Sequence, residues 1–200
     1  MLKKLFTNDK FFFITVFITV LCTVIDLFSL VMSGADLLMH LSWISTHLLI
    51  AIFTVIIYIS YLKHNKNIMK AVIGMLFGVL LMSDISSLVF YLSYSMDAFY
   101  GYVYVVLDII LIVNHLVLNS THSSRPLAIK VNQITLLLQA TASVFTFVGT
   151  IKNISLSETN IYDLLSTVVS PFLFVFAVAS IVCVESRLDL YKAIREQKND

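Results

Sequence analysis

Residues 11–33, FFFITVFITVLCTVIDLFSLVMS, decide the fold class of this chain. The stretch carries one charged residue, Asp26, and it is long enough to cross a bilayer, which takes about 20 predominantly apolar residues. Five further stretches of similar character follow it. The predicted spans are residues 11–33, 37–62, 71–95, 99–118, 131–151 and 161–184. The sequence therefore predicts an all-α bundle of six transmembrane helices, surrounded by the lipid bilayer.

The composition supports a polytopic membrane protein over other classes. Residues of the set AVILMFWYC make up 59% of the 200 residues, charged residues make up 12%, and the mean hydropathy is +0.94. A soluble domain carries about twice that share of charge. The net charge of +1 gives no sign of a surface that binds a polyanion. These values exclude a soluble enzyme, a disordered chain and a nucleic-acid binder.

Basic residues fall almost entirely on one side of the predicted spans. Of the 13 Lys and Arg residues, only Lys152 lies on the other side. The rest precede the first span, follow the sixth, or lie between spans two and three or four and five. By the positive-inside rule, this bias predicts a multi-pass protein of the cell membrane with both termini in the cytoplasm.

The membrane domain is expected to cover residues 1–184, and residues 185–200 are expected to form a cytoplasmic tail. Leu188, Tyr191 and Ile194 recur in that tail at helical spacing. Such a short amphipathic helix is suited to lie on the inner membrane face or to bind a cytoplasmic protein. The sequence contains no H-E-x-x-H, no G-x-S-x-G and no Gly-rich phosphate loop, so we expect no enzyme.

Several small features of the spans predict how the helices pack. Gly74 and Gly78 form a G-x-x-x-G, which allows close helix contact. We expect that contact within the bundle, with a homo- or hetero-oligomer as the alternative. Pro171 predicts a kink in its helix. We favour a role in helix packing, and a hinge is the alternative. Cys22 and Cys183 differ in depth by about 14 Å, too far for a disulfide, so both are expected to be free.

Ionisable groups inside a bilayer are costly and are functional hypotheses by default. Counted from the outer ends of their helices, four such groups on four spans lie within about 6 Å of each other in depth. They are Asp26, His47, Asp84 and Asp108. We expect them to line a shared polar cavity in the outer half of the bundle. His40, Trp43 and Tyr104 are expected to form its outer wall, and His115 lies nearer the cytoplasm.

Polar side chains follow one face of several predicted helices and support a polar interior. The stripe in the first span is Thr15, Thr19, Thr23, Asp26, Ser29 and Ser33. The stripe in the fifth span is Asn132, Thr135, Gln139, Ser143, Thr146 and Thr150. Each follows the step of three or four residues that keeps side chains on one side of a helix. For any single Ser or Thr, the alternative is a hydrogen bond between helices.

Three roles for the four ionisable groups stay open at this point. They suit a site for a ligand or cation, with Asp26, His47, Asp84 and Asp108 as candidate ligands of a divalent transition metal. They also suit a proton relay, as Asp and His chains do in transporters. The third role is structural, with Asp–His pairs that fix the helix register. The sequence identifies no particular ligand or cofactor.

The function that follows is a membrane subunit that binds or transports a small solute or cation. In size and topology, the chain is similar to the substrate-binding subunits of energy-coupling-factor transporters, a likeness of architecture alone. The alanine-spaced docking motif that those subunits use in their first helix is absent here. The alternatives are a membrane sensor or regulatory subunit, which signals to a cytoplasmic partner through residues 185–200, and a structural scaffold without a ligand.

Overall fold

The structure is a computed structural model that describes residues 2–34, 40–93, 99–120, 125–153 and 161–197. Within these ranges the regular structure is helical. The helices are α1 (Leu2–Phe6), α2 (Asp9–Met32), α3 (Leu41–Leu62), α4 (Lys66–Ser93), α5 (Phe99–Ser120), α6 (Arg125–Asn153) and α7 (Ile161–Gln197). Among the described residues, six helices, α2 to α7, are long and apolar enough to cross a membrane. The predicted class, a helical bundle with six candidate spans, is confirmed.

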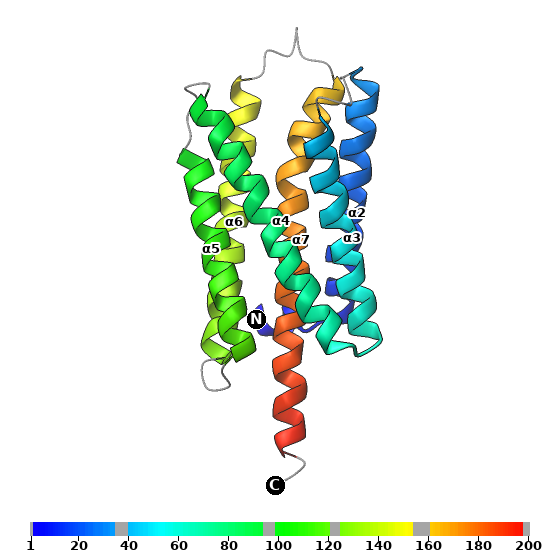
Figure 1. Ribbon diagram of the computed structural model, residues 1–200, viewed down its shortest axis with the longest axis vertical. Helices are drawn as coiled ribbons and strands as arrows, with labels where there is room; N and C mark the ends of the chain where they lie inside the picture. Colours follow the sequence, from blue (N-terminus) through cyan, green and yellow to red (C-terminus); the bar gives the residue numbers. More distant parts are fainter. Residues whose placement is uncertain (1, 35–39, 94–98, 121–124, 154–160, 198–200) are drawn as a thin grey trace.

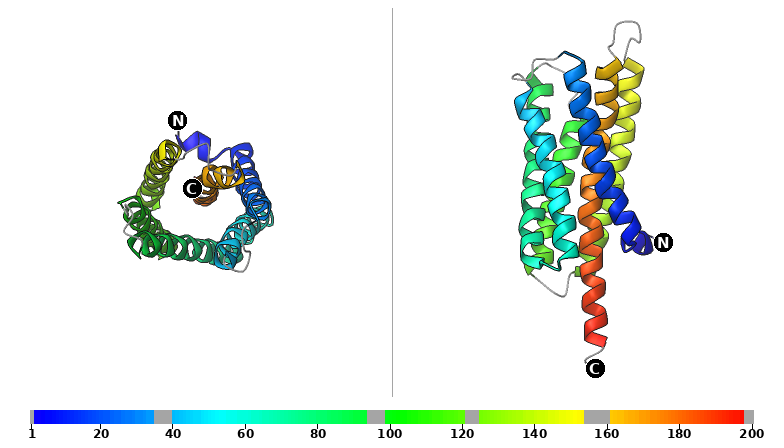
Figure 2. Two further views of the ribbon diagram at one scale, coloured as in Figure 1. Left: turned by 90° about the horizontal axis from the view of Figure 1, so that it is seen from above. Right: turned by 90° about the vertical axis from the view of Figure 1, so that its right-hand side faces the viewer.

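The six long helices form one bundle (Figure 1), in which each helix packs against the next one along the chain. Seen along the bundle axis they form a ring, in which α7 lies between α6 and α2 (Figure 2). Helix α7 packs against α2, α3 and α6, and it is the most buried of the candidate spans. The N-terminal segment and the end of α7 lie toward the same end of the bundle (Figure 1). The even number of long helices accounts for this arrangement.

Local signals in the sequence set several helix ends. The side chain of Asn8 accepts a hydrogen bond of 2.9 Å from the Lys10 amide and so caps α2. Gly34 follows α2 with φ of 74°, a conformation that glycine adopts without strain. Between α3 and α4, Asn65 turns the chain, since its amide donates to the Ser60 carbonyl over 2.9 Å. This tight turn holds α3 and α4 as antiparallel neighbours.

The core and the lipid-facing surface are both apolar, as a membrane bundle requires. The fully buried side chains include Phe12, Ile50, Ile57, Leu76, Leu111 and Leu173. Large apolar side chains on the outside include Phe13, Phe17, Phe28, Met82, Val106 and Phe145. An exposed apolar coat of this extent would be costly in water, whereas lipid solvates it. The structure therefore supports contact between the helices and lipid.

The threonine stripe of α2 is buried, but it does not line a cavity. The hydroxyls of Thr15, Thr19 and Thr23 donate to backbone carbonyls three or four residues earlier in the same helix. Ser180 of α7 adds an interhelical bond, donating to the Thr15 hydroxyl over 3.0 Å. This hydrogen bond between helices therefore involves Thr15, whereas those of Thr19 and Thr23 stay within α2.

The expected role of the G-x-x-x-G inside the bundle is wrong. Gly74 and Gly78 are exposed, and a Cβ added to either would meet no other atom within 4 Å. The close helix approach is instead at Gly101 of α5, where a Cβ would lie 3.1 Å from Leu88 Cδ1 on α4. Contact through Gly74 and Gly78 between separate chains stays a prediction.

Helix α7 runs without a break from Ile161 to Gln197, with Pro171 inside it. Residues 185–197 continue α7, which projects beyond the other helices (Figure 1), and their role as a cytoplasmic tail stays a prediction. Cys22 and Cys183 are buried and free, as expected.

Candidate functional site

A cavity of about 150 Å³ lies between α4, α5, α6 and α7. Its polar wall comes from α4, α5 and α6 and includes Asp84, Tyr104, Asp108, Gln139, Ser143 and Thr146. Helix α7 supplies a mainly apolar wall, which includes Pro171, Phe174, Val175 and Val178. The cavity thus has one face rich in oxygen atoms and one face rich in hydrocarbon.

The polar wall follows directly from helical spacing. Tyr104 and Asp108 are one turn apart on α5, and Gln139 and Ser143 are one turn apart on α6, so each pair shares a face. The two faces meet across the cavity. Gln139 Nε2 donates to Asp108 Oδ1 over 2.8 Å, and the Tyr104 hydroxyl donates to Ser143 Oγ over 3.2 Å.

The central feature of the cavity is a pair of carboxyl groups. The carboxyl groups of Asp84 and Asp108 both line the cavity and interact electrostatically. Asp108 is 1% exposed, and its Oδ2 receives no hydrogen bond from a donor group of the described residues. Two carboxylates that line one cavity repel each other, so the pair needs a proton or a cation between its oxygens. The arrangement therefore suits the binding of positive charge.

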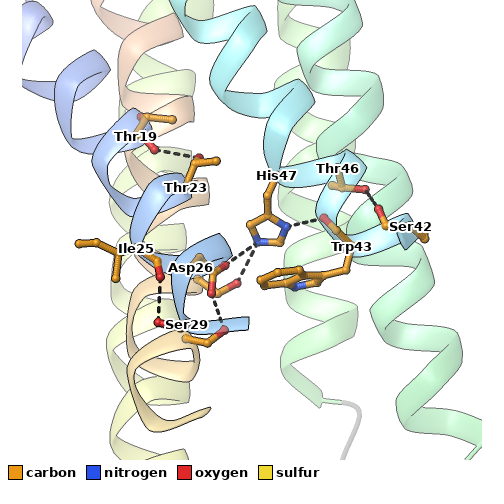
Figure 3. Close-up of polar contacts among 11 residues, drawn as sticks. Thr19, Thr23, Ile25, Asp26, Ser29, Ser42, Trp43, Thr46 and His47 are labelled. Atoms are coloured by element: carbon orange, nitrogen blue, oxygen red, sulfur yellow. Dashed lines mark hydrogen bonds and ion pairs between the residues drawn. The ribbon is translucent and has the colours of Figure 1, made fainter. Parts of the chain in front are cut away.

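A second buried pair, Asp26 and His47, lies between α2 and α3. Figure 3 shows His47 pointing from α3 toward Asp26 on α2, with His47 Nε2 3.2 Å from Asp26 Oδ2. Both side chains are buried. Ser166 of α7 donates to the other carboxyl oxygen of Asp26. The imidazole ring also packs against Trp43, with ring centroids 4.1 Å apart and ring planes tilted by 39°.

The tautomer of His47 follows from its partners. Nδ1 lies 2.8 Å from the Trp43 carbonyl oxygen, which can only accept a hydrogen bond, so Nδ1 carries a proton. Nε2 faces both Asp26 and, at 3.3 Å, the hydroxyl of Ser170. A catalytic triad would place the carboxylate and the serine on opposite ring nitrogens. Here both lie at Nε2, so the cluster does not have the geometry of an activated nucleophile.

Helix α7 lies between the two pairs and contacts both. Ser170 reaches His47 and also lines the cavity that contains Asp84 and Asp108. Phe174, one turn later, packs edge-on against the His47 ring at 5.8 Å and lines the same cavity. One face of α7 therefore forms the boundary between the pairs.

The structure brings the four ionisable residues together as two pairs. Within the described part of the chain, it forms no group of three or more His, Cys, Asp or Glu that could hold a metal ion. Of the expected outer wall, Tyr104 lines the cavity, Trp43 packs on His47, and His40 is exposed where α3 begins. The binding role of each residue stays a prediction.

Sequence reasoning missed a third polar cluster, toward the end of the bundle where α7 projects. Glu185 of α7 accepts hydrogen bonds from Asn132 Nδ2 over 2.8 Å and from His115 Nδ1 over 3.1 Å. Asn119 Nδ2 donates to His115 Nε2 over 3.0 Å. Because both imidazole nitrogens have partners of matching type, a neutral His115 fits this network. The sequence carried one signal of this cluster. His115 lies seven residues after Asp108, which places it on the face of α5 that lines the cavity.

Arg187 is also buried, although charged side chains usually lie at the surface. It is 2% exposed, with its guanidinium 4.7 Å from the centre of the Phe12 ring and 5.2 Å from that of Tyr61. Its Nη2 lies 3.0 Å from the exposed carboxylate of Asp9 at the start of α2. The residue ties the end of the α7 span to α2 and α3.

The chain was compared with protein-family models, curated proteins and solved structures, and no match was found. The geometry of the described residues therefore carries the functional argument.

Proposed function

We propose that this protein is an integral membrane subunit that binds a small cationic solute in the cavity between α4 and α7 and takes part in its transport. The observation that carries the proposal is the Asp84–Asp108 pair, whose two carboxyl groups line one cavity. A cation that enters between them replaces the shared proton and relieves the repulsion. The net charge of the pair is the same before and after the exchange, because one positive charge replaces another.

The size and lining of the cavity favour a small organic monocation. Cavities of about 150 Å³ admit molecules as large as benzene. The hydroxyls and carboxyls of one wall accept hydrogen bonds from an ammonium group, while the α7 wall packs against a short hydrocarbon body. A divalent transition metal would draw on imidazole or thiolate ligands as well, and the cavity lining contains neither.

The placement in the cell is part of the same proposal. We place the protein in the cell membrane with both termini in the cytoplasm. Twelve of the 13 basic residues precede, follow or connect the spans on that side, and the two ends of the chain lie toward the same end of the bundle (Figure 1). The cavity then lies in the outer half of the membrane.

Native mass spectrometry and thermal unfolding of the detergent-purified protein test the binding proposal. The probes are methylammonium, trimethylammonium and guanidinium, with Mn²⁺ as a metal comparison. A probe present at 100 times its Kd should stabilise the wild type by about 2.7 kcal/mol. Asp108→Asn should abolish the stabilisation, because the pair loses one of its two negative charges.

Glu185→Gln is the matched control, since it neutralises a buried carboxyl group outside the cavity. It should keep the stabilisation that each probe gives, whatever its own baseline stability. The proposal fails if none of the organic cations binds, or if the two variants lose binding equally. A scaffold without a ligand predicts that Asp108→Asn changes stability alone.

A sensor is the second candidate, because α7 runs unbroken from the cavity wall to Gln197. In a sensor, ligand binding changes the conformation or contacts of residues 188–197. Hydrogen exchange of that segment with and without a bound probe separates the two functions. A changed exchange rate favours the sensor, and an unchanged rate favours the transport subunit.

A further inference from the structure

We propose that the Asp26–His47 pair is a proton site that exchanges with the cation in the cavity, through Ser170. The proposal rests on the function proposed above and adds its energetic coupling. Cation entry would release the proton shared by Asp84 and Asp108, and it would also favour loss of the proton on His47 Nε2. Both protons pass to bulk water, so positive charge moves into the cavity as positive charge leaves the protein.

Only one atom of His47 can change its protonation. Nδ1 keeps its proton because it faces the Trp43 carbonyl oxygen at 2.8 Å. Nε2 alone can gain or lose one, and its neighbours are Asp26 Oδ2 at 3.2 Å and Ser170 Oγ at 3.3 Å. The state of Nε2 therefore sets the orientation of the Ser170 hydroxyl.

The orientation of the Ser170 hydroxyl changes the acceptor atoms that it offers to the cavity. When Nε2 carries no proton, Ser170 donates to it, and the hydroxyl oxygen is free to offer its lone pairs to the cavity. When Nε2 carries a proton, Ser170 accepts from it, and the O–H turns away from the ring. A cation needs acceptor oxygens, so it favours the first arrangement. Binding and deprotonation of Nε2 are thereby linked, and linkage acts in both directions.

The charged and titratable groups around His47 come from α2, α4 and α5. Helix α2 contributes Asp26, and Cys22 lies one turn earlier on the same helix. From α7 the contacts are Ser166 and Ser170, which do not titrate in the ordinary range.

Across α7 lie Asp84 of α4 and Asp108 of α5, in the cavity that Ser170 lines. Among the described residues that line this cavity or contact the Asp26–His47 pair, there is no Lys or Arg. Ser170 and Phe174 of α7 contact His47 and also line the cavity that contains the other pair.

Helix α7 is less tightly hydrogen-bonded along its backbone near Ser170. Pro171 has no backbone N–H, so the helix lacks one hydrogen bond beside Ser170. Ser166, Ser170 and Phe174 are spaced four residues apart and share the face that contacts the Asp26–His47 pair. Displacement of this face by a bound cation would change the contacts of His47 directly.

Calorimetry in two buffers of different ionisation enthalpy counts the protons released. The titrant is methylammonium, and the proteins are the full-length wild type and Ser170→Ala in detergent. We expect more than one proton released per cation by the wild type and about one by Ser170→Ala, which retains only the Asp84–Asp108 contribution. Ser166→Ala is the control, since Ser166 contacts Asp26 but does not line the cavity.

Equal proton counts for the wild type and Ser170→Ala would overturn the coupling and leave the binding function standing. If methylammonium does not bind, the cation-binding proposal loses its support, and the coupling is tested without a ligand. In ¹⁵N-histidine spectra at one pH, Asp108→Asn should shift the His47 Nε2 resonance when Ser170 is present. It should leave that resonance in place in the Ser170→Ala background, and the His115 resonances should stay fixed throughout. A His47 resonance that ignores Asp108→Asn in both backgrounds refutes the coupling.

Discussion

Removal of Glu185 is the sharpest test of the buried polar cluster that joins α5, α6 and α7. The Glu185 carboxyl is 6% exposed and accepts from His115 Nδ1 at 3.1 Å and from Asn132 Nδ2 at 2.8 Å. Glu185→Ala leaves both donors without an acceptor in a site that water does not reach. We expect this variant to unfold at a lower denaturant concentration than the wild type.

The magnitude follows from the two lost bonds. Hydrogen bonds between membrane helices contribute about 0.6 kcal/mol on average and at most about 1.7 kcal/mol. Two of them give a loss of about 1–3 kcal/mol, before any penalty for the unpaired donors. Glu185→Gln keeps one acceptor oxygen and should lose about half as much. Unfolding of the detergent-solubilised protein in SDS, followed by circular dichroism, measures both variants.

A double-mutant cycle with His115→Ala separates the bond from general disruption. If the pair interacts as the structure shows, the double variant should lose less stability than the sum of the single losses. The difference should be about 0.6–1.7 kcal/mol. Losses that simply add would refute a direct His115–Glu185 interaction. An effect of Glu185→Ala below the error of the measurement would refute the whole cluster.

Two further predictions concern packing and charge. Gly101→Val should destabilise the protein by about 1–3 kcal/mol in thermal unfolding, because even a Cβ there would lie 3.1 Å from a Leu88 methyl carbon. Gly74→Val, where a Cβ meets nothing, should be near neutral in a monomer, and a change of oligomeric state by native mass spectrometry would instead indicate contact between chains. Arg187→Ala should lower the melting temperature more than Asp9→Asn, because the guanidinium is buried between two aromatic rings while Asp9 is 84% exposed. Equal effects would contradict that placement.

The fold was predictable from the sequence because span length and apolar content are local properties. The helix bounds shift by a few residues, as at α4, which begins at Lys66 where the predicted span began at residue 71. Helices continue beyond the apolar stretch when turns and caps allow it, so the hydrophobic run alone does not give their ends. The unbroken course of α7 through residue 184 has the same cause.

For the candidate site, the depth of each residue in the bundle was predictable from the sequence. The rotation of each helix about its own axis was not. Counting residues along each helix placed Asp26, His47, Asp84 and Asp108 at nearly one level, and the structure divides them into two pairs. The way each helix turns about its own axis depends on tertiary packing, which one sequence does not reveal. The position of α7 between the pairs was therefore not predictable, and neither was the outward turn of Gly74.

The contacts of α7 indicate which part of the bundle can change its conformation. Beyond Pro171, Ser180 bonds to Thr15 and Glu185 bonds to His115 and Asn132, so this part is fixed to α2, α5 and α6. Before Pro171, Ser166 and Ser170 contact a pair whose hydrogen bonds depend on protonation, and Tyr162 packs edge-on against Phe28 of α2. We expect a change in the cavity to displace the part of α7 before Pro171 more readily than the part that the Glu185 cluster fixes. The missing backbone bond at Pro171 lies between the two parts, where such a movement requires the least disruption of the helix.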